Sequence, residues 1–191
     1  GVHGAGTLSL TFTNLTADTD HFFRVAATNA GGESLPSETV ACRRASDPAT
    51  TKVLLVNGFD RFDRFINLRQ TPSGTYKPPG HGGNSGTMDR VIARGNNAFD
   101  YGVPHAQAVS ATGFPYDSCQ NEAVASGLVS LSAYPIVIWA SGQESTADES
   151  FSSTEQTRVA AYLSAGGNLF LSGSEIAWDL DRASGPTAAD R

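Results

Sequence analysis

The chain has 191 residues, 39% of them hydrophobic and 17% charged, with a formal net charge of −6 and a pI near 5.1. This composition is typical of one or two folded domains and excludes a disordered chain. Its acidic balance provides no basic surface for nucleic acid. The longest apolar runs, VLLV and YPIVIWA, are too short to cross a bilayer, so we expect no membrane span and no nucleic-acid partner.

Three strands are predicted in the first 45 residues. Residues 7–15, TLSLTFTNL, alternate apolar and polar side chains, and residues 21–30, HFFRVAATNA, repeat this period, which is typical of half-buried strands. The cluster NAGGES predicts a hairpin turn, because glycine accepts the positive φ that such turns need. The third strand is predicted at residues 38–44, ETVACRR.

The stretch NLTADTDHFFRVAATNAGGESLPSETV resembles the last three strands of a fibronectin type III domain, with His21 at the position of that family's corner tyrosine. A complete sandwich of this kind takes about 100 residues. We therefore expect residues 1–45 to be the C-terminal part of such a domain, in a piece of a longer multidomain protein. The resemblance implies a spacing or docking module without chemistry of its own.

A short polar linker at 46–51 leads into a second segment, 52–191, with the pattern of an α/β domain. The runs KVLLVNGFD, YPIVIWASGQES and GGNLFLSGSE are typical of parallel strands that are buried on both faces. Between the last two, SFSSTEQTRVAAYLSAGG predicts a helix with a Ser152–Glu155 capping box and Gly166 at its end, so that the three elements form a right-handed βαβ unit.

A further helix is predicted around HAQAVSATG and a further strand at FPYDSC. We therefore predict a three-layer, doubly wound, mostly parallel sheet, flavodoxin-like or similar to the glutamine-amidotransferase fold, preceded by the partial fibronectin type III β-sandwich. The final DRASGPTAADR reads as a loop where another strand is expected, so we also expect the α/β domain to be truncated at its C-terminus.

Candidate site residues follow the predicted strands, because open parallel sheets bind ligands beyond the carboxyl ends of their strands. Two of these ends, SGQES and SGSEI, share a small residue, a glycine and a carboxylate. If the strands are neighbours, Asp60, Glu144 and Glu175 point into one crevice as candidate catalytic residues. The candidate ligand-binding residues at the same ends are Asn57, Gly58, Arg61, Gln143, Ser172, Gly173 and Asp179.

The chemistry of the three carboxylates is left open between three alternatives. Clustered carboxylates raise at least one pKa, which sets a general acid beside a general base. They can equally hold a divalent cation through their oxygens, and this is the one cofactor that the sequence suggests. Each carboxylate could instead cap the helix that follows it.

Among possible bases and nucleophiles, His105 is the main candidate. It begins a predicted helix with Asp100 nearby, so it could be a base oriented by a carboxylate, or a structural hydrogen-bonder at the helix start. The G-x-S-x-G elbow of hydrolases is absent, since SGSEI lacks the second glycine, and no cysteine stands at such an elbow. These absences argue against the amidotransferase reaction.

The two cysteines, Cys42 and Cys119, are too few for a disulfide framework and lack the spacing of a metal site. We interpret them as small buried hydrophobic residues. A bridge between them would tie the two predicted segments together, but sequence does not place their Cα atoms within reach.

Three motifs in the second segment together resemble a known group of proteins: VLLVNGFDR, FDYGVPHAQAV and SGQESTADESFSSTEQTRVAAYLSAGGNLFLSGSEIAWDL. They are similar to the α/β domain of secreted bacterial proteins labelled xanthan-lyase-like or N-acetylmuramoyl-L-alanine-amidase-associated, in which a fibronectin type III module precedes this domain. The resemblance implies a secreted or cell-surface protein with polysaccharide or cell-wall ligands and neighbouring domains of the same chain as partners. We expect a hydrolase or lyase module; the alternative is a noncatalytic extracellular module that binds a ligand or supports other domains.

Overall fold

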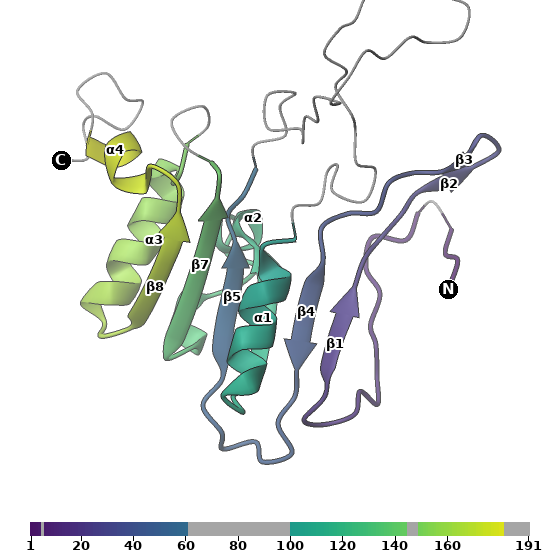
Figure 1. The fold of residues 1–191 in the computed structure, drawn as a ribbon, viewed down its shortest axis with the longest axis horizontal. Helices are drawn as coiled ribbons and strands as arrows, with labels where there is room; N and C mark the ends of the chain where they lie inside the picture. Colours follow the sequence, from purple (N-terminus) through teal and green to yellow (C-terminus); the bar gives the residue numbers. More distant parts are fainter. Residues whose placement is uncertain (5, 61–99, 145–148, 182–191) are drawn as a thin grey trace, which may run out of the picture.

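The computed structural model describes residues 1–4, 6–60, 100–144 and 149–181. Its centre is a six-stranded mixed sheet with the strand order β1-β4-β6-β5-β7-β8 (Figure 1). Four neighbouring strands are parallel, namely β6 (Tyr116–Gln120), β5 (Val53–Asn57), β7 (Ile136–Gly142) and β8 (Asn168–Gly173). The antiparallel strands β4 (Val40–Arg43) and β1 (Asp20–Phe23) extend the sheet beyond β6. The predicted α/β class is thereby confirmed.

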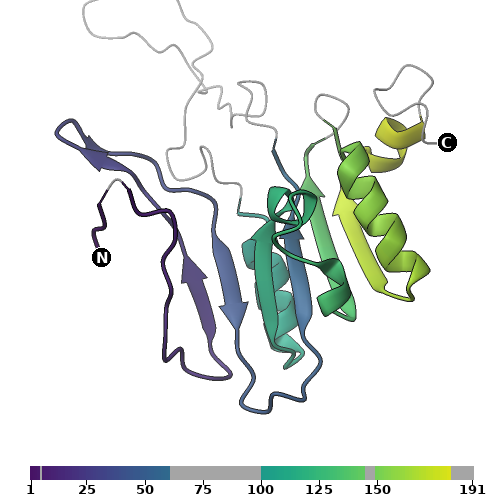
Figure 2. The same ribbon diagram turned by 180° about the vertical axis from the view of Figure 1, so that it is seen from behind.

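The helices cover both faces of this sheet (Figures 1 and 2). On one face α1 (Gly102–Ala111) packs over the middle strands through Ala106 and Val109. On the other face lie α2 (Asn121–Ala125), the short 3₁₀ helix η1 (Leu131–Ala133) and α3 (Ser153–Ser164).

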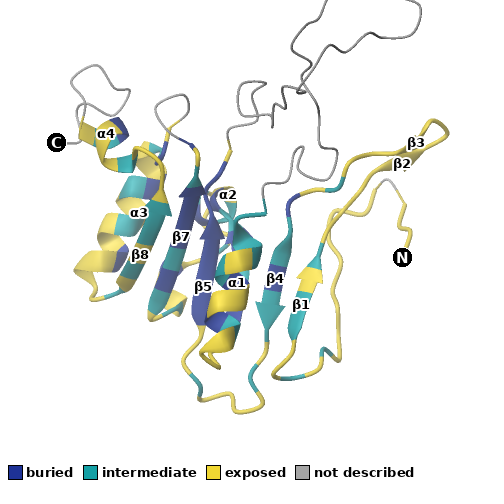
Figure 3. Ribbon diagram, viewed as in Figure 1, coloured by how far each residue is buried: buried dark blue, intermediate teal, exposed yellow. Residues whose placement is uncertain are grey.

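All five residues of β5 are buried (Figure 3), as its continuous apolar run predicts. Its side chains alternate between two hydrophobic clusters. Val53 and Leu55 belong to the cluster under α1, and Leu54 and Val56 to the cluster under α2 and α3. The two faces of one strand thus hold both helical layers.

The connections between the parallel strands reverse direction at β5. β6 lies on one side of β5 and the next strand in the chain, β7, lies on the other side. In open parallel sheets the loops diverge at such a reversal and leave a crevice at the carboxyl ends of the strands. A ligand site, if the fold follows this rule, is therefore expected at the carboxyl ends of β5 and β7.

The predicted capping box of α3 is present. The Ser152 hydroxyl accepts a hydrogen bond from the backbone N–H of Glu155, and the Glu155 carboxylate accepts one from the backbone N–H of Ser152. Gly166, with φ of +86°, follows the last turn, as predicted for the end of the helix.

The strands β1 to β4, within residues 20–43, form a long antiparallel ribbon, which we call the N-terminal ribbon and which joins the edge of the parallel strands. Its tip is the hairpin of β2 (Thr28–Asn29) and β3 (Gly32–Glu33), which confirms the predicted turn. At its base Arg43 of β4 pairs with Tyr116 of β6, so the sheet is continuous from the ribbon into the parallel strands. The predicted linker at 46–51 lies between β4 and β5, and the division into two domains stays a prediction.

The strand predicted at residues 7–15 is wrong, because this described stretch contains no strand. Its alternating apolar residues have no sheet to be buried against: Leu8 is 98% exposed and Phe12 is 53% exposed. Nε2 of His21 donates a hydrogen bond to the Thr16 carbonyl oxygen, 3.0 Å away, because a carbonyl oxygen can only accept.

The chain has no membrane-spanning candidate among the helices of the described ranges, since none of them is long and apolar enough. The last described helix is α4 (Ile176–Asp181), beyond the carboxyl end of β8. The thiols of Cys42 and Cys119 are both free; Cys119 is buried as predicted, whereas Cys42, also predicted to be buried, is only partly buried.

Candidate functional site at the carboxyl edge of the parallel strands

The candidate site residues were predicted to lie together if their strands are neighbours. β5, β7 and β8 do lie next to one another in this order, with β7 in the middle. Their carboxyl ends lie at one edge, and α4 and the start of α1 lie toward the same edge (Figure 1). We refer to this edge, with the residues that follow β5, β6, β7 and β8, as the carboxyl edge.

At the end of β5, Asn57 is the centre of a buried polar network. Its amide nitrogen donates to the side-chain oxygen of Gln120 at 2.7 Å and to the carboxylate of Glu38. Gln120, the last residue of β6, also donates to Glu38 at 3.4 Å. The network links two parallel strands to the N-terminal ribbon, which supplies the only carboxylate of the three side chains.

The loop after β5 is held by Glu144. The Glu144 carboxylate accepts a hydrogen bond from the backbone N–H of Asp60 at 2.7 Å and is only 1% exposed. The Asp60 side chain is more accessible, and its carboxylate accepts a hydrogen bond from Asn121, the first residue of α2, at 2.9 Å. Glu144 therefore anchors a backbone segment, whereas Asp60 reaches the surface of the edge.

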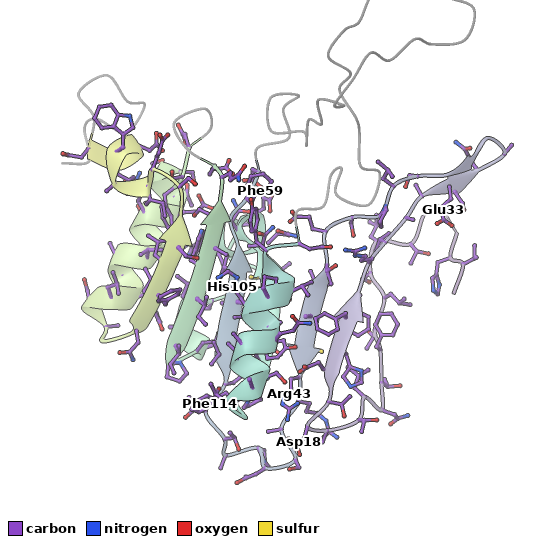
Figure 4. All side chains as sticks on the ribbon, in the orientation of Figure 1. Asp18, Glu33, Arg43, Phe59, His105 and Phe114 are labelled. Atoms are coloured by element: carbon purple, nitrogen blue, oxygen red, sulfur yellow. The ribbon has the colours of Figure 1, made fainter. Side chains whose placement is uncertain are left out.

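Two glycines permit close packing in this region. A Cβ at Gly58 would lie 2.3 Å from Nε1 of Trp139, and a Cβ at Gly142 would lie 2.2 Å from the ring of Tyr101. The Tyr101 ring in turn packs edge-on against Phe59, with ring centroids 5.1 Å apart (Figure 4 labels Phe59 beyond the end of β5). The carboxyl ends of β5 and β7 are thus packed by aromatic side chains that fit against bare backbone.

Tyr101 lies in an acidic environment. Burial raises the pKa of its hydroxyl, and the negative charges of Glu38 and Glu144 raise it further. Each of these effects favours the neutral phenol. Tyr101 therefore brings a neutral hydroxyl into the neighbourhood of two carboxylates that come from distant parts of the chain.

The structure brings together two predicted site residues, His105 of α1 and Ser172 of β8. Nε2 of His105 lies 3.3 Å from the Ser172 hydroxyl oxygen, and Nδ1 lies 2.6 Å from the backbone carbonyl oxygen of Tyr101. The predicted pairing of His105 with Asp100 is not what orients the ring. The Asp100 carboxylate accepts hydrogen bonds from Thr39 and pairs with an arginine of the ribbon.

The acidic residues near the end of β8 have different surroundings. Glu175 is exposed and has a positive φ of +59°, and it follows a strand that β7 separates from β5. Asp179 in α4 is fully buried, and its carboxylate accepts a hydrogen bond from the backbone N–H of Ser150 at 2.9 Å. Glu144 and Asp179 thus share one role in the structure, which is to accept a backbone N–H while buried.

The remaining predicted residues also lie at the carboxyl edge where they are described. Gln143 is exposed, and Gly173 is the last residue of β8, where it pairs with Gly142. A Cβ at Gly173 would lie 2.9 Å from the side chain of Ser141, so the glycine permits close approach of β7 and β8. Arg61 lies outside the described residues.

A divalent cation finds no ready-made carboxylate cage in the part of the chain that is described. There, no group of three or more His, Cys, Asp or Glu side chains is placed to hold a metal ion. The carboxyl edge instead offers mixed amide, hydroxyl and carboxylate groups, which are suited to hydrogen bonding with a polar ligand.

Four buried polar atoms at the carboxyl edge have no hydrogen-bond partner within the described ranges. They are Oδ1 of Asn57, Oδ1 of Asn121, Nε1 of Trp139 and Oγ of Ser141. Buried polar groups in folded proteins nearly always have a partner, and each exception calls for a specific explanation. All four residues lie around the ends of β5, β6 and β7, so this edge holds a cluster of buried polar atoms that need a partner.

Sequence reasoning missed four residues of this site. Gln120 and Asn121 follow the strand predicted at FPYDSC, so the same rule of strand ends would have found them. Glu38 and Tyr101 carried no such signal, because they come from the ribbon and from the segment just before α1. The sequence of this chain matches no protein-family profile, no curated protein and no solved structure.

Proposed function

We propose that the carboxyl edge is the ligand site of a module in a secreted multidomain bacterial protein that acts, by hydrolase or lyase chemistry, on polysaccharide or peptidoglycan. The observation that carries this proposal is the set of buried polar atoms without partners at that edge. Leaving such an atom unpaired costs about 1–3 kcal/mol. An ordered water held beside each of these buried atoms would satisfy it, and such waters can bridge to a ligand rich in hydroxyl and amide groups.

The class of ligand rests on the resemblance of VLLVNGFDR, FDYGVPHAQAV and the long SGQES…AWDL motif to secreted, cell-wall-associated proteins. Sugars and cell-wall peptides present the hydroxyl and amide groups that this site can bind. Asp60 and Gln143 follow β5 and β7 and are both exposed, so we expect such a ligand to contact their side chains first.

We also propose that the sheet belongs to the flavodoxin-like architecture, which glutamine-amidotransferase-like domains share. Counted along the chain, the parallel strands lie in the order second, first, third, fourth. This matches the first four positions of the flavodoxin-like order 2-1-3-4-5, whose ligands bind at the reversal between the first and third strands. In this chain those strands are β5 and β7.

The proposal is tested by binding of the purified chain to insoluble peptidoglycan and to immobilised polysaccharides. The double variant Asp60→Asn/Gln143→Ala is expected to bind at least tenfold more weakly, because both groups are exposed at the carboxyl edge. The matched control is Asp47→Asn/Gln107→Ala, which changes an exposed acid and an exposed amide away from the carboxyl edge. Equal binding by the two double variants, or no binding by the unmodified chain, refutes the proposal.

A noncatalytic ligand-binding or structural module is the second candidate. It is favoured by the burial of Glu144 and Asp179, whose carboxylates accept backbone N–H groups and thereby stabilise the loops. The variant Glu144→Gln separates the two candidates. A lower melting temperature with unchanged ligand turnover places Glu144 in the scaffold, and binding without any turnover by the unmodified chain supports the noncatalytic module.

A further inference from the structure

We propose that Ser172 is a nucleophile that His105 activates, and that this pair cleaves acyl esters carried by the glycan ligand. This inference rests on the proposed function for the nature of the ligand. It assigns a specific bond and two specific residues to the carboxyl edge. The observation behind it is the hydrogen bond between the Ser172 hydroxyl and Nε2 of His105.

The hydrogen bonds of His105 fix the direction of proton transfer. A backbone carbonyl only accepts hydrogen bonds, so Nδ1 must donate to the Tyr101 carbonyl oxygen, 2.6 Å away. In the neutral imidazole Nε2 then carries the lone pair, and the Ser172 hydroxyl, 3.3 Å away, must donate to it. This is the arrangement that a general base needs in order to take the serine proton.

The group that orients His105 is itself held firmly. Tyr101 packs edge-on against Phe59, which is 1% exposed, and its ring covers Gly142 so closely that a Cβ there would clash. Because its ring packs against these two residues, Tyr101 is held in place. Its carbonyl oxygen accepts a hydrogen bond from Nδ1 of His105 and so favours one tautomer of the imidazole. The carbonyl thus does what a carboxylate does in the Ser-His-Asp arrangement.

The pair is accessible to a substrate. Ser172 and His105 are each only partly buried, and Ser172 stands in β8, at the edge of the sheet. Phe170, two residues earlier and therefore on the same face of β8, is 58% exposed. Figure 4 shows His105 on α1, on the side of the helix near the parallel strands. An acyl group can approach the serine across this open face.

The composition of the pair points to an ester bond and away from a glycosidic bond. Glycosidases use two carboxylates that flank the scissile bond, whereas Glu144 and Asp179 are buried and already bound to backbone N–H groups. A serine with a neutral histidine base is instead suited to acyl transfer.

The reaction balances without a cofactor. The Ser172 oxygen attacks the acyl carbon as its proton moves to Nε2 of His105, and a tetrahedral intermediate forms. Cleavage of the bond between the acyl carbon and the sugar oxygen follows, and His105 gives its proton to that oxygen. Water, deprotonated by His105, then attacks the acyl-serine; the Ser172–carbon bond breaks, the proton returns to Ser172, and a carboxylic acid leaves.

The test is covalent labelling of the full chain with a fluorophosphonate probe, followed by peptide mass spectrometry, together with hydrolysis of p-nitrophenyl acetate. We expect the label on Ser172, at least 100-fold faster than on the exposed Ser174, and an acyl-enzyme burst. Ser172→Ala is expected to abolish both signals, His105→Gln to slow both at least 100-fold, and Ser174→Ala to change neither. Thermal unfolding shows whether each variant is folded.

The outcomes separate this inference from the proposed function. Absence of label on Ser172 in the unmodified chain, or labelling that is equally fast in folded His105→Gln, overturns the inference even where glycan binding is observed. Label on Ser172 with no binding to any glycan supports the pair and overturns the proposed ligand class. If His105→Gln does not fold, the ratio of labelling at Ser172 to Ser174 in the unmodified chain decides the matter.

Discussion

Gly142→Ala is expected to destabilise the protein much more than Gly113→Ala. Both glycines have positive φ, +52° and +83°, so an alanine costs about 1–2 kcal/mol at either position. Their surroundings differ. A Cβ at Gly142 would lie 2.2 Å from a ring atom of Tyr101, whereas a Cβ at Gly113 has no atom within 4 Å.

The additional cost at Gly142 depends on whether the Tyr101 ring can move away. It cannot do so freely, because it packs against Phe59, which is buried. Forcing an extra methyl group into such a contact costs about 1–3 kcal/mol. The free energy of unfolding should therefore fall by about 2–5 kcal/mol for Gly142→Ala and by about 1–2 kcal/mol for Gly113→Ala. At about 2–4 °C per kcal/mol, the melting temperatures should differ by several degrees.

The measurement is urea unfolding followed by tryptophan fluorescence, since Trp139 is buried beside the same crevice. Combining Gly142→Ala with Tyr101→Leu should recover part of the loss, because contacting residues show non-additive effects. Equal losses for the two single alanine variants would show that Tyr101 is not fixed over Gly142. The Tyr101 carbonyl would then not be held in a fixed position from which it could orient His105.

Three further predictions concern local features of the fold. Ser152→Ala should lower the free energy of unfolding by about 1 kcal/mol, because it removes the cap of α3. The measurement is urea unfolding, with the exposed Ser153→Ala as the control. Equal effects of the two substitutions would contradict the role of the cap. Burial raises the pKa of Cys119 to about 12 and also raises that of Cys42. Because only the thiolate reacts, iodoacetamide at pH 8 should leave Cys119 unmodified in the native protein and should alkylate it after unfolding. Fast alkylation of Cys119 in the native protein, measured by mass spectrometry, would contradict this prediction. Lys52→Met should change the free energy of unfolding by less than about 1 kcal/mol, because its ion pair with Asp117 is exposed; a larger loss in the urea experiment would contradict the weak pair.

The parallel strands were predictable because their signal is local. β5, β7 and β8 each follow from a continuous apolar run, and the cap of α3 follows from four consecutive residues. The failed strand at residues 7–15 shows the limit of such signals. A period of two tells which way the side chains point, but it does not supply a neighbouring strand against which Leu8 and Phe12 could be buried.

The two similar strand ends show why the site was only partly predictable. SGQES and SGSEI share the same pattern, yet Glu144 is buried under the loop after β5 whereas Glu175 is exposed. The difference arises from what lies above each strand end. β7 is internal, and the loop after its neighbour β5 binds Glu144 through the Asp60 N–H, whereas β8 is the outermost strand among the described residues and Glu175 after it is exposed.

The network of Asn57 shows that the N-terminal ribbon is part of the candidate site. Glu38 accepts hydrogen bonds from Asn57 and Gln120, and the neighbouring Thr39 donates two to Asp100, directly before Tyr101. Without the ribbon, the amide groups of Asn57 and Gln120 would lose their carboxylate partner, and the segment that positions the His105 ring would lose its anchor. Because these contacts join residues 19 to 82 positions apart, no local pattern reveals them. The geometry of the candidate site thus depends on a β-segment for which the sequence predicted no chemical role.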